Sequence, residues 1–149
     1  MPILEVNNLK KVYVQRLGGS HVQALSDVTF SVEEGEYAAI MGESGSGKTT
    51  LLNILAAFDK PTSGEVLLSG RNINDISEKE ISAFRRENLG FVFQDFNLLD
   101  TFTLKENIFL PLVLSGKKYP EMSALLAPVA RRLGITDILL KYPYEVSGG

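Results

Sequence analysis

The sequence contains no cysteine and a single histidine, His21. These two scarcities exclude a disulfide framework, a thiolate zinc site and a histidine cluster. Fifteen Lys and Arg residues against eighteen Asp and Glu residues give a net charge of -3. The basic excess that is typical of proteins binding nucleic acid or anionic membranes is therefore absent. We expect His21 to lie on the surface without a functional role.

Long apolar runs are missing as well. No stretch approaches the roughly 20 apolar residues that a membrane-spanning helix needs. The N-terminus lacks the basic and then apolar pattern of a secretory signal, and the absence of cysteine fits a reducing compartment. We therefore expect a cytosolic chain. Its 149 residues, 44% of them hydrophobic, are enough for one globular unit with a buried core.

Hydrophobic periodicity predicts two kinds of strand. Alternating apolar and polar residues over 3–14 and 28–32 indicate half-buried antiparallel strands, with the residues 18–20 in a hairpin loop between them. Continuous apolar runs at 37–41 and 89–93 are typical of strands buried on both faces, as in the centre of a parallel sheet. A mixed α/β fold follows from these patterns.

Four segments predict helices. Apolar residues recur at helical spacing over 49–58, and two capping boxes, Ser77 to Glu80 and Thr103 to Glu106, predict helix starts. The helix that begins at the Thr103 to Glu106 capping box is expected to run toward Leu110, where Pro111 bends or closes it. The fourth helix would bury one face and end at Gly134. The residues predicted on this face are Met122, Leu125, Val129 and Leu133.

The segment 42–49, with the sequence GESGSGKT, matches the phosphate-loop pattern G-x-x-x-x-G-K-[ST]. Its context also fits, because a buried strand is predicted before it and a helix after it. Glycines allow the backbone to turn its N–H groups toward phosphate oxygens, and the helix N-terminus adds a partial positive charge. Lys48 would reach the β- and γ-phosphates, and the Thr49 hydroxyl would coordinate Mg²⁺. A glycine-rich turn without a ligand is the alternative.

Together with this loop, three further features resemble the ATP-binding subunits of ABC transporters: Tyr13, Gln94 and the segment 146–149, which has the sequence VSGG. The segment 90–107, GFVFQDFNLLDTFTLKEN, is similar to the branch of lipoprotein-release, macrolide-export and bacitracin-type peptide-resistance transporters. The resemblance implies a P-loop NTPase of the ABC type, with an antiparallel β subdomain, a parallel core sheet and a helical lobe.

The resemblance also implies roles for individual residues. Tyr13 would stack on adenine, although an aromatic side chain in a strand can also belong to the core. Gln94 would contact Mg²⁺ and the attacking water, and it would act in catalysis with Lys48. The apolar residues after it, Phe96, Leu98 and Leu99, would either contact a partner or pack inside the helical lobe. The nucleotide-binding residues would be Tyr13, Gly42, Glu43, Ser44, Gly45, Ser46, Gly47, Lys48, Thr49, Thr50, Gln94, Ser147, Gly148 and Gly149.

We expect residues 1–149 to form the N-terminal portion of one ABC ATP-binding domain, with the β subdomain and phosphate-loop core in 1–94 and the helical lobe in 95–149. Family members carry an Asp-Glu strand and a sensor histidine beyond the VSGG element. The 149-residue chain alone is therefore expected to be inactive, whereas the full-length protein would hydrolyse ATP with Mg²⁺.

The expected partners are an integral-membrane permease and a second copy arranged head to tail, at the cytoplasmic face of the membrane. No nucleic-acid partner is expected. The alternatives are a soluble ABC ATPase without a transport role and a nucleotide-binding module without turnover. A small-molecule kinase is disfavoured because nothing in the sequence supplies an acceptor pocket.

Overall fold

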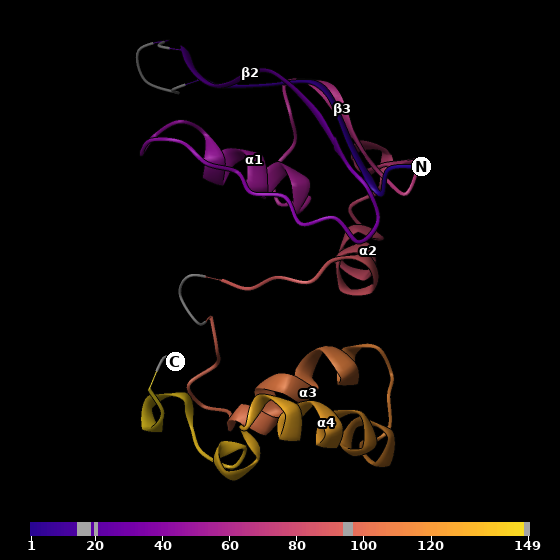
Figure 1. The fold of residues 1–149 in the computed structure, drawn as a ribbon, viewed down its shortest axis with the longest axis vertical. Helices are drawn as coiled ribbons and strands as arrows, with labels where there is room; N and C mark the ends of the chain where they lie inside the picture. Colours follow the sequence, from indigo (N-terminus) through magenta and orange to yellow (C-terminus); the bar gives the residue numbers. More distant parts are fainter. Residues whose placement is uncertain (15–18, 20, 94–96, 148–149) are drawn as a thin grey trace. The chain divides into compact units, whose positions relative to one another are not determined.

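The structure is a computed structural model, and it describes residues 1–14, 19, 21–93 and 97–147. The chain divides into two compact units, Met1–Gly90 and Phe91–Gly149. The described part of the first unit combines a β-sheet with short helices, whereas that of the second unit contains only helices and turns (Figure 1).

The first unit is built on a four-stranded antiparallel sheet with the strand order β2-β1-β3-β4. Its long hairpin consists of β1, Leu4–Val14, and β2, His21–Val32, and the sheet continues with β3, Ser63–Leu68, and β4, Arg71–Asn72. The predicted antiparallel pair is confirmed, but β2 begins at His21 rather than at Val28. The short strand β4 has no sequence signal of its own.

A bulge interrupts the alternation of β1. Val6 and Leu9 are both fully buried, although strict alternation would place Asn8 beside Val6. The pairing with β2 shifts between Val6 and Leu9, and Asn8 has a positive φ of 48°. Its backbone N–H donates to Thr29 Oγ1 over 2.9 Å. The extra residue turns the second half of β1 so that Leu9 reaches the core.

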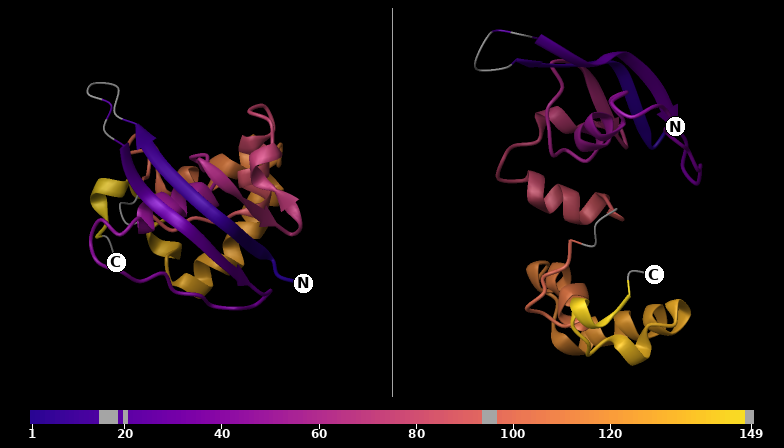
Figure 2. Two further views of the ribbon diagram at one scale, coloured as in Figure 1. Left: turned by 90° about the horizontal axis from the view of Figure 1, so that it is seen from above. Right: turned by 90° about the vertical axis from the view of Figure 1, so that its left-hand side faces the viewer.

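Helix α1, Lys48–Leu55, lies against one face of this sheet (Figures 1 and 2). Leu51 and Ile54 are buried, but Leu52 and Phe58, which the helical spacing predicts on the same apolar face, are 54% and 52% exposed. The helix ends at Leu55, a few residues before the predicted end at Phe58. The buried cluster of the first unit comprises Val6, Leu9, Leu25, Leu51, Ile54, Val66, Ile73, Ile76 and Phe84.

The first capping box is only partly formed. Ser77 Oγ donates to Glu80 Oε2 over 2.7 Å, but Ser77 is not the residue that caps the helix. Helix α2 begins after Glu80 and spans Ile81–Asn88, with Phe84 buried. Between β4 and α2 the chain forms a 3-10 turn, η1, at Ile73–Asp75.

The two segments predicted as central parallel strands, 37–41 and 89–93, are not strands in this structure. Tyr37 is 97% exposed, and Val92 is fully exposed. A strand needs a hydrogen-bonding neighbour, and no described segment pairs with either run. The apolar patterns therefore identified segments suited to burial without identifying the strands that would pair with them.

The second unit packs α3, Leu104–Leu114, beside α4, Tyr119–Leu133 (Figure 1). The second capping box is confirmed, because Glu106 N–H donates to Thr103 Oγ1 and Thr103 N–H donates to Glu106 Oε2. Helix α3 continues past Pro111, so this proline does not close it. Two 3-10 turns follow, η2 at Thr136–Ile138 and η3 at Pro143–Glu145.

The buried face of α4 differs from the predicted one. Met122 is buried as expected, but Leu125, Val129 and Leu133 are 47%, 52% and 66% exposed. The neighbouring stripe faces Phe109 of α3 instead, and it consists of Met122, Leu126 and Ala130. Two adjacent apolar stripes satisfy helical spacing equally well, and the position of α3 decides between them. The predicted end is confirmed by Gly134, whose φ is 69°. No helix in the described ranges is long and apolar enough to cross a membrane.

Candidate functional site

The phosphate loop leads directly into α1, and Gly47 is the residue that precedes this helix. This residue has a φ of 92°, and a Cβ atom added there would lie 2.3 Å from the Ala24 carbonyl oxygen. That distance leaves no room for a side chain, so glycine is required for both conformation and space. Gly47 carries no capping side chain, and the first turn of α1 contains no acidic residue. The first N–H groups of α1 can therefore serve an anionic ligand.

Lys48 extends along the inside of the loop. Its Nζ donates to the carbonyl oxygens of Gly42 over 2.7 Å and Glu43 over 2.6 Å, and it lies 3.4 Å from Ser46 Oγ. The ammonium group is thus held among the backbone groups of the segment that is predicted to bind phosphates. Thr49 follows on the first turn of α1 with its side chain exposed.

Tyr13 lies near the end of β1 and takes part in a cluster of three polar side chains. Its hydroxyl donates to Asp59 Oδ2 over 2.9 Å, while Lys11 Nζ donates to Asp59 Oδ1 over 2.6 Å. Lys11 Nζ also donates to the Lys60 carbonyl and lies 4.8 Å from the centre of the Tyr13 ring. Tyr13 remains 41% exposed, so it is not a core residue.

Burial raises the pKa of Asp59, but the surrounding donors outweigh it. Hydrogen bonds from the Lys11 ammonium, the Tyr13 hydroxyl and the Lys60 backbone N–H, together with the charge of Lys11, lower the pKa of this carboxyl below its ordinary value. The side chain of Lys11 is only 12% exposed, so its charge is poorly screened by water. Asp59 is therefore ionised in the folded protein at neutral pH.

Strand β2 connects the Tyr13 cluster to the phosphate loop. Val22 pairs with Tyr13, whereas the carbonyl of Ala24 faces Gly47. The register passes from Lys11 with Leu25 to Val12 with Gln23, so Ala24 is the extra residue of a bulge. Val22 and Ala24 are about 7 Å apart along a strand. The aromatic ring and the phosphate loop thus lie near the same stretch of β2.

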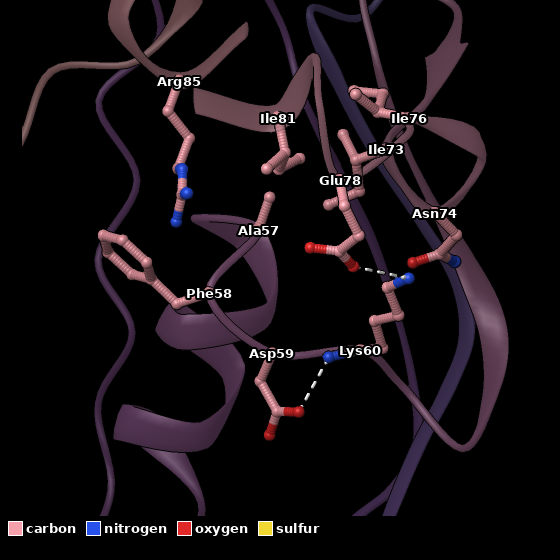
Figure 3. A pocket seen from close by; sticks show the side chains of 10 residues that line it. All are labelled: Ala57, Phe58, Asp59, Lys60, Ile73, Asn74, Ile76, Glu78, Ile81 and Arg85. Carbon is pink, nitrogen blue, oxygen red and sulfur yellow. Dashed lines mark hydrogen bonds and ion pairs between the residues drawn. The ribbon is translucent and has the colours of Figure 1, made fainter. Parts of the chain in front are cut away.

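Asp59 is also one of the residues that line a cavity of about 490 Å³ within the first unit (Figure 3). Arg85 lies over the Phe58 ring, with 4.8 Å between the guanidinium carbon and the ring centre. Lys60 Nζ pairs with Glu78 over 3.3 Å, and the Lys60 backbone N–H donates to Asp59 Oδ1. Besides Phe58, the apolar residues of the lining are Ala57, Ile73, Ile76 and Ile81.

One predicted site residue belongs to the second unit, and others fall outside the described residues. Ser147 belongs to the second unit and is exposed. Gln94, Gly148 and Gly149, as well as Phe96, fall outside the described residues. Sequence reasoning missed Lys11 and Asp59. Lys11 shares a strand face with Tyr13, but no pattern links either residue to position 59.

The sequence comparisons identify the class of protein. The model of the ABC transporter family matches residues 25–149, and the chain therefore belongs to this family. The chain is 52% identical over its full length to the uncharacterized ABC transporter ATP-binding protein YvcR of Bacillus subtilis strain 168, of which it spans 58%. It is 47% identical to the bacitracin export ATP-binding protein BceA of Halalkalibacterium halodurans, again covering 100% of this chain and 58% of the relative.

Solved structures agree with this assignment. The fold is similar to that of the dimeric ATP-binding cassette MJ0796 bound to ADP and Pi, with a TM-score of 0.86 and 35% identity. The similarity covers 97% of this chain and 63% of MJ0796. The expected fold class, an α/β cassette of the ABC type, is confirmed. The chain spans less than two thirds of the length of each of these relatives.

Proposed function

We propose that this chain contributes the ATP-binding portion of the subunit that powers an ABC membrane transporter, of the antimicrobial-peptide-resistance or the lipoprotein or macrolide export type. One observation carries the ATP-binding part of this proposal. Gly47 adopts a left-handed conformation where α1 begins, and the Lys48 ammonium lies inside the loop. The name of the relative BceA supports the transporter type.

The phosphate loop would bind the triphosphate through its backbone N–H groups. Lys48 would donate to the β- and γ-phosphates, and these charge-assisted hydrogen bonds are stronger than those it makes with carbonyl oxygens. Tyr13 would stack on the adenine ring, and the 41% exposure of this residue supports the role. The residues that would contact the phosphates are Gly42, Glu43, Ser44, Gly45, Ser46, Gly47, Lys48, Thr49 and Thr50.

The Thr49 hydroxyl fits a Mg²⁺ ion because it is an exposed oxygen ligand on the first turn of α1, beside the proposed phosphate site. Gln94 would supply a second oxygen. Bound Mg²⁺ would neutralise charge on the phosphates. One or two protein oxygens suffice, since this ion commonly keeps waters and phosphate oxygens as its remaining ligands.

Lys48 and Gln94 would act in hydrolysis. Lys48 would stabilise the negative charge on the transferred phosphoryl group, and Gln94 would orient the attacking water. The family resemblance places the carboxylates that hold Mg²⁺ and polarise this water in a segment after the VSGG element. We therefore expect no Lys48-dependent phosphate release from an isolated 1–149 polypeptide.

Two partners complete the proposal. The element formed by Ser147, Gly148 and Gly149 would contact the γ-phosphate of ATP held by a second copy, and the dimeric state of MJ0796 supports this arrangement. An integral-membrane permease would place the protein at the cytoplasmic face of the membrane. ATP turnover would then drive movement of the permease.

Replacing Gln94 with Ala in the complete protein tests the division between binding and turnover. A fluorescent ATP analogue should bind almost as tightly as to the wild type, while phosphate release and its stimulation by the reconstituted permease should fall together. The control is Ser82→Ala, at an exposed position of α2. Loss of binding with preserved turnover of bound ATP would contradict the role of Gln94, and wild-type protein without ATP binding would contradict the whole proposal.

A further inference from the structure

A tyrosine near the end of a strand has two rotatable bonds, so its ring needs a support before it can serve as a fixed binding surface. In this protein the support comes from outside β1. The Tyr13 hydroxyl donates to Asp59 Oδ2 over 2.9 Å, and Asp59 lies in the turn between α1 and β3. A partner so distant along the chain can hold the far end of the ring only once the first unit has folded.

Lys11 fixes the same carboxylate from a second direction. Its Nζ donates to Asp59 Oδ1 over 2.6 Å and to the Lys60 carbonyl over 2.6 Å. The carboxylate therefore accepts from three donors, Lys11 Nζ and the Lys60 backbone N–H on Oδ1 and the Tyr13 hydroxyl on Oδ2, and its remaining freedom is small. Lys11 Nζ also lies 4.8 Å from the centre of the Tyr13 ring, which places a cation on one face of the ring.

We propose that Asp59 and Lys11 are positioning residues that hold the Tyr13 ring in the orientation in which its face opposite Lys11 receives the nucleotide base. This inference rests on the proposed function, in which Tyr13 stacks on adenine. A ring that is already immobilised loses less conformational freedom when the base binds, so binding is tighter. The base would still be recognised by its face, because Asp59 and Lys11 would act on the base only through the Tyr13 ring.

A purely structural role for Asp59 is the competing explanation, since the pair with Lys11 also ties β1 to the turn after α1. The two explanations predict that Asp59→Ala weakens the binding of different ligands. A positioning role affects only ligands that carry a base, whereas a loosened first unit weakens every ligand of the phosphate loop. Inorganic tripolyphosphate provides the ligand without a base.

The test measures the affinities of the complete protein for ATP and for inorganic tripolyphosphate by isothermal titration. Asp59→Ala should weaken ATP binding about three- to ten-fold and leave tripolyphosphate binding unchanged within about two-fold. Tyr13→Phe keeps the ring but removes the hydroxyl, and it should give a similar loss for ATP alone. Asp59→Ala should also be measured in the Tyr13→Phe background. There the change in the logarithm of the ATP affinity should be less than about half of the change in the wild-type background, because the shared hydrogen bond is already gone.

Equal losses for ATP and tripolyphosphate in Asp59→Ala would overturn the positioning role, and so would full additivity of the two substitutions. Tyr13→Phe still tests the positioning role if Asp59→Ala fails to fold, because it removes only one oxygen atom from the side chain. Tyr13→Ala separates this inference from the proposed function. If Tyr13→Ala weakens ATP selectively but Asp59→Ala does not, only the positioning role fails. If Tyr13→Ala leaves ATP affinity unchanged, the stacking role itself fails.

Discussion

Lys48 and Tyr13 both form hydrogen bonds inside the first unit, but their partners lie at very different distances along the chain. Lys48 bonds to Gly42, six residues away, whereas Tyr13 bonds to Asp59, 46 residues away. The phosphate loop is thus formed within one short segment, and the Tyr13 cluster forms only when β1 meets the turn after α1. A local arrangement can be recognised in the sequence, and a long-range one cannot.

The two regions also differ in the groups that form them. The phosphate loop depends on backbone atoms and on the absence of a side chain at Gly47, so it should be intolerant of added bulk. The cluster depends on the side chains of Lys11, Tyr13 and Asp59, so it should respond to charge and pH. Substitutions in the two regions should therefore change different properties.

The largest effect is expected from Gly47→Ala. The added Cβ would lie 2.3 Å from the Ala24 carbonyl, and the left-handed backbone costs a non-glycine residue about 1–2 kcal/mol. ATP binding should become unmeasurable, and the midpoint of thermal unfolding should fall. Gly45→Ala is the matched control for stability, because Gly45 has a φ of 82° but nothing within 4 Å of its added Cβ. Equal losses of stability would show that the contact with Ala24 is unimportant.

Lys48→Ala should weaken ATP binding by about 100-fold, because the triphosphate loses charge-assisted hydrogen bonds worth about 1.5–3 kcal/mol each. Equilibrium titration with a fluorescent ATP analogue measures this loss, and circular dichroism checks that the variant is folded. Lys79→Ala, at an exposed position before α2, removes the same charge as a control. Unchanged affinity in folded Lys48→Ala protein would refute the assignment of the phosphate loop.

Tyr13→Ala should reduce the affinity for ATP and GTP by similar factors of about ten, because stacking of a base on an aromatic ring contributes about 1–3 kcal/mol and tolerates any base. Competition titrations with both nucleotides measure the two factors. Tyr37→Ala is the control, since Tyr37 is 97% exposed in the same unit. A loss confined to ATP would indicate that the edge of the base is recognised instead of its face.

The smallest effect concerns pH. Burial raises the pKa of Asp59, but hydrogen bonds from Lys11 and Tyr13 lower it overall, so the ionised carboxyl favours the folded state. This stabilisation is complete above the unfolded pKa of 3.8 and is lost as the pH falls through the lower folded value. Urea unfolding should therefore find Asp59→Asn less stable than the wild type at pH 7, with a difference that shrinks below about pH 4.

Lys11→Met removes the main donor to this carboxylate and provides the comparison for the pH experiment. In the Lys11→Met background, the effect of Asp59→Asn on the free energy of unfolding should depend less on pH than it does in the wild type. A difference between Asp59→Asn and the wild type that is constant from pH 7 to pH 3 would contradict the proposed role of the ionised carboxyl.

Sequence patterns were sufficient wherever a few neighbouring residues decide the conformation. The capping box of Thr103 and Glu106, the glycine end of α4 at Gly134 and the phosphate loop at 42–49 all depend on contacts within a few positions. The alternation of β1 was also recognised, but the bulge at Asn8 was not, because it depends on pairing with β2 and on the hydrogen bond to Thr29.

Sequence patterns were insufficient wherever an element distant along the chain decides whether a segment forms a strand or is buried. The runs 37–41 and 89–93 have the composition of central strands, but strand formation requires a neighbour that composition cannot identify. Helix α4 carries two adjacent apolar stripes, and the packing of Phe109 buries the one containing Leu126. In each case the sequence indicates that a surface is apolar, and the neighbouring element determines whether that surface is buried.

The sequence by itself determined that the chain carries a phosphate loop with Lys48 and Thr49 at the start of a helix, because glycine placement and the helix start are local properties. Only the tertiary structure revealed that Ala24 excludes any side chain at Gly47, and that Tyr13 and Lys11 both donate hydrogen bonds to Asp59. These contacts join segments of β1, β2 and the turn after α1. They exist because the core containing Leu9, Leu25 and Leu51 brings those segments together when the first unit folds.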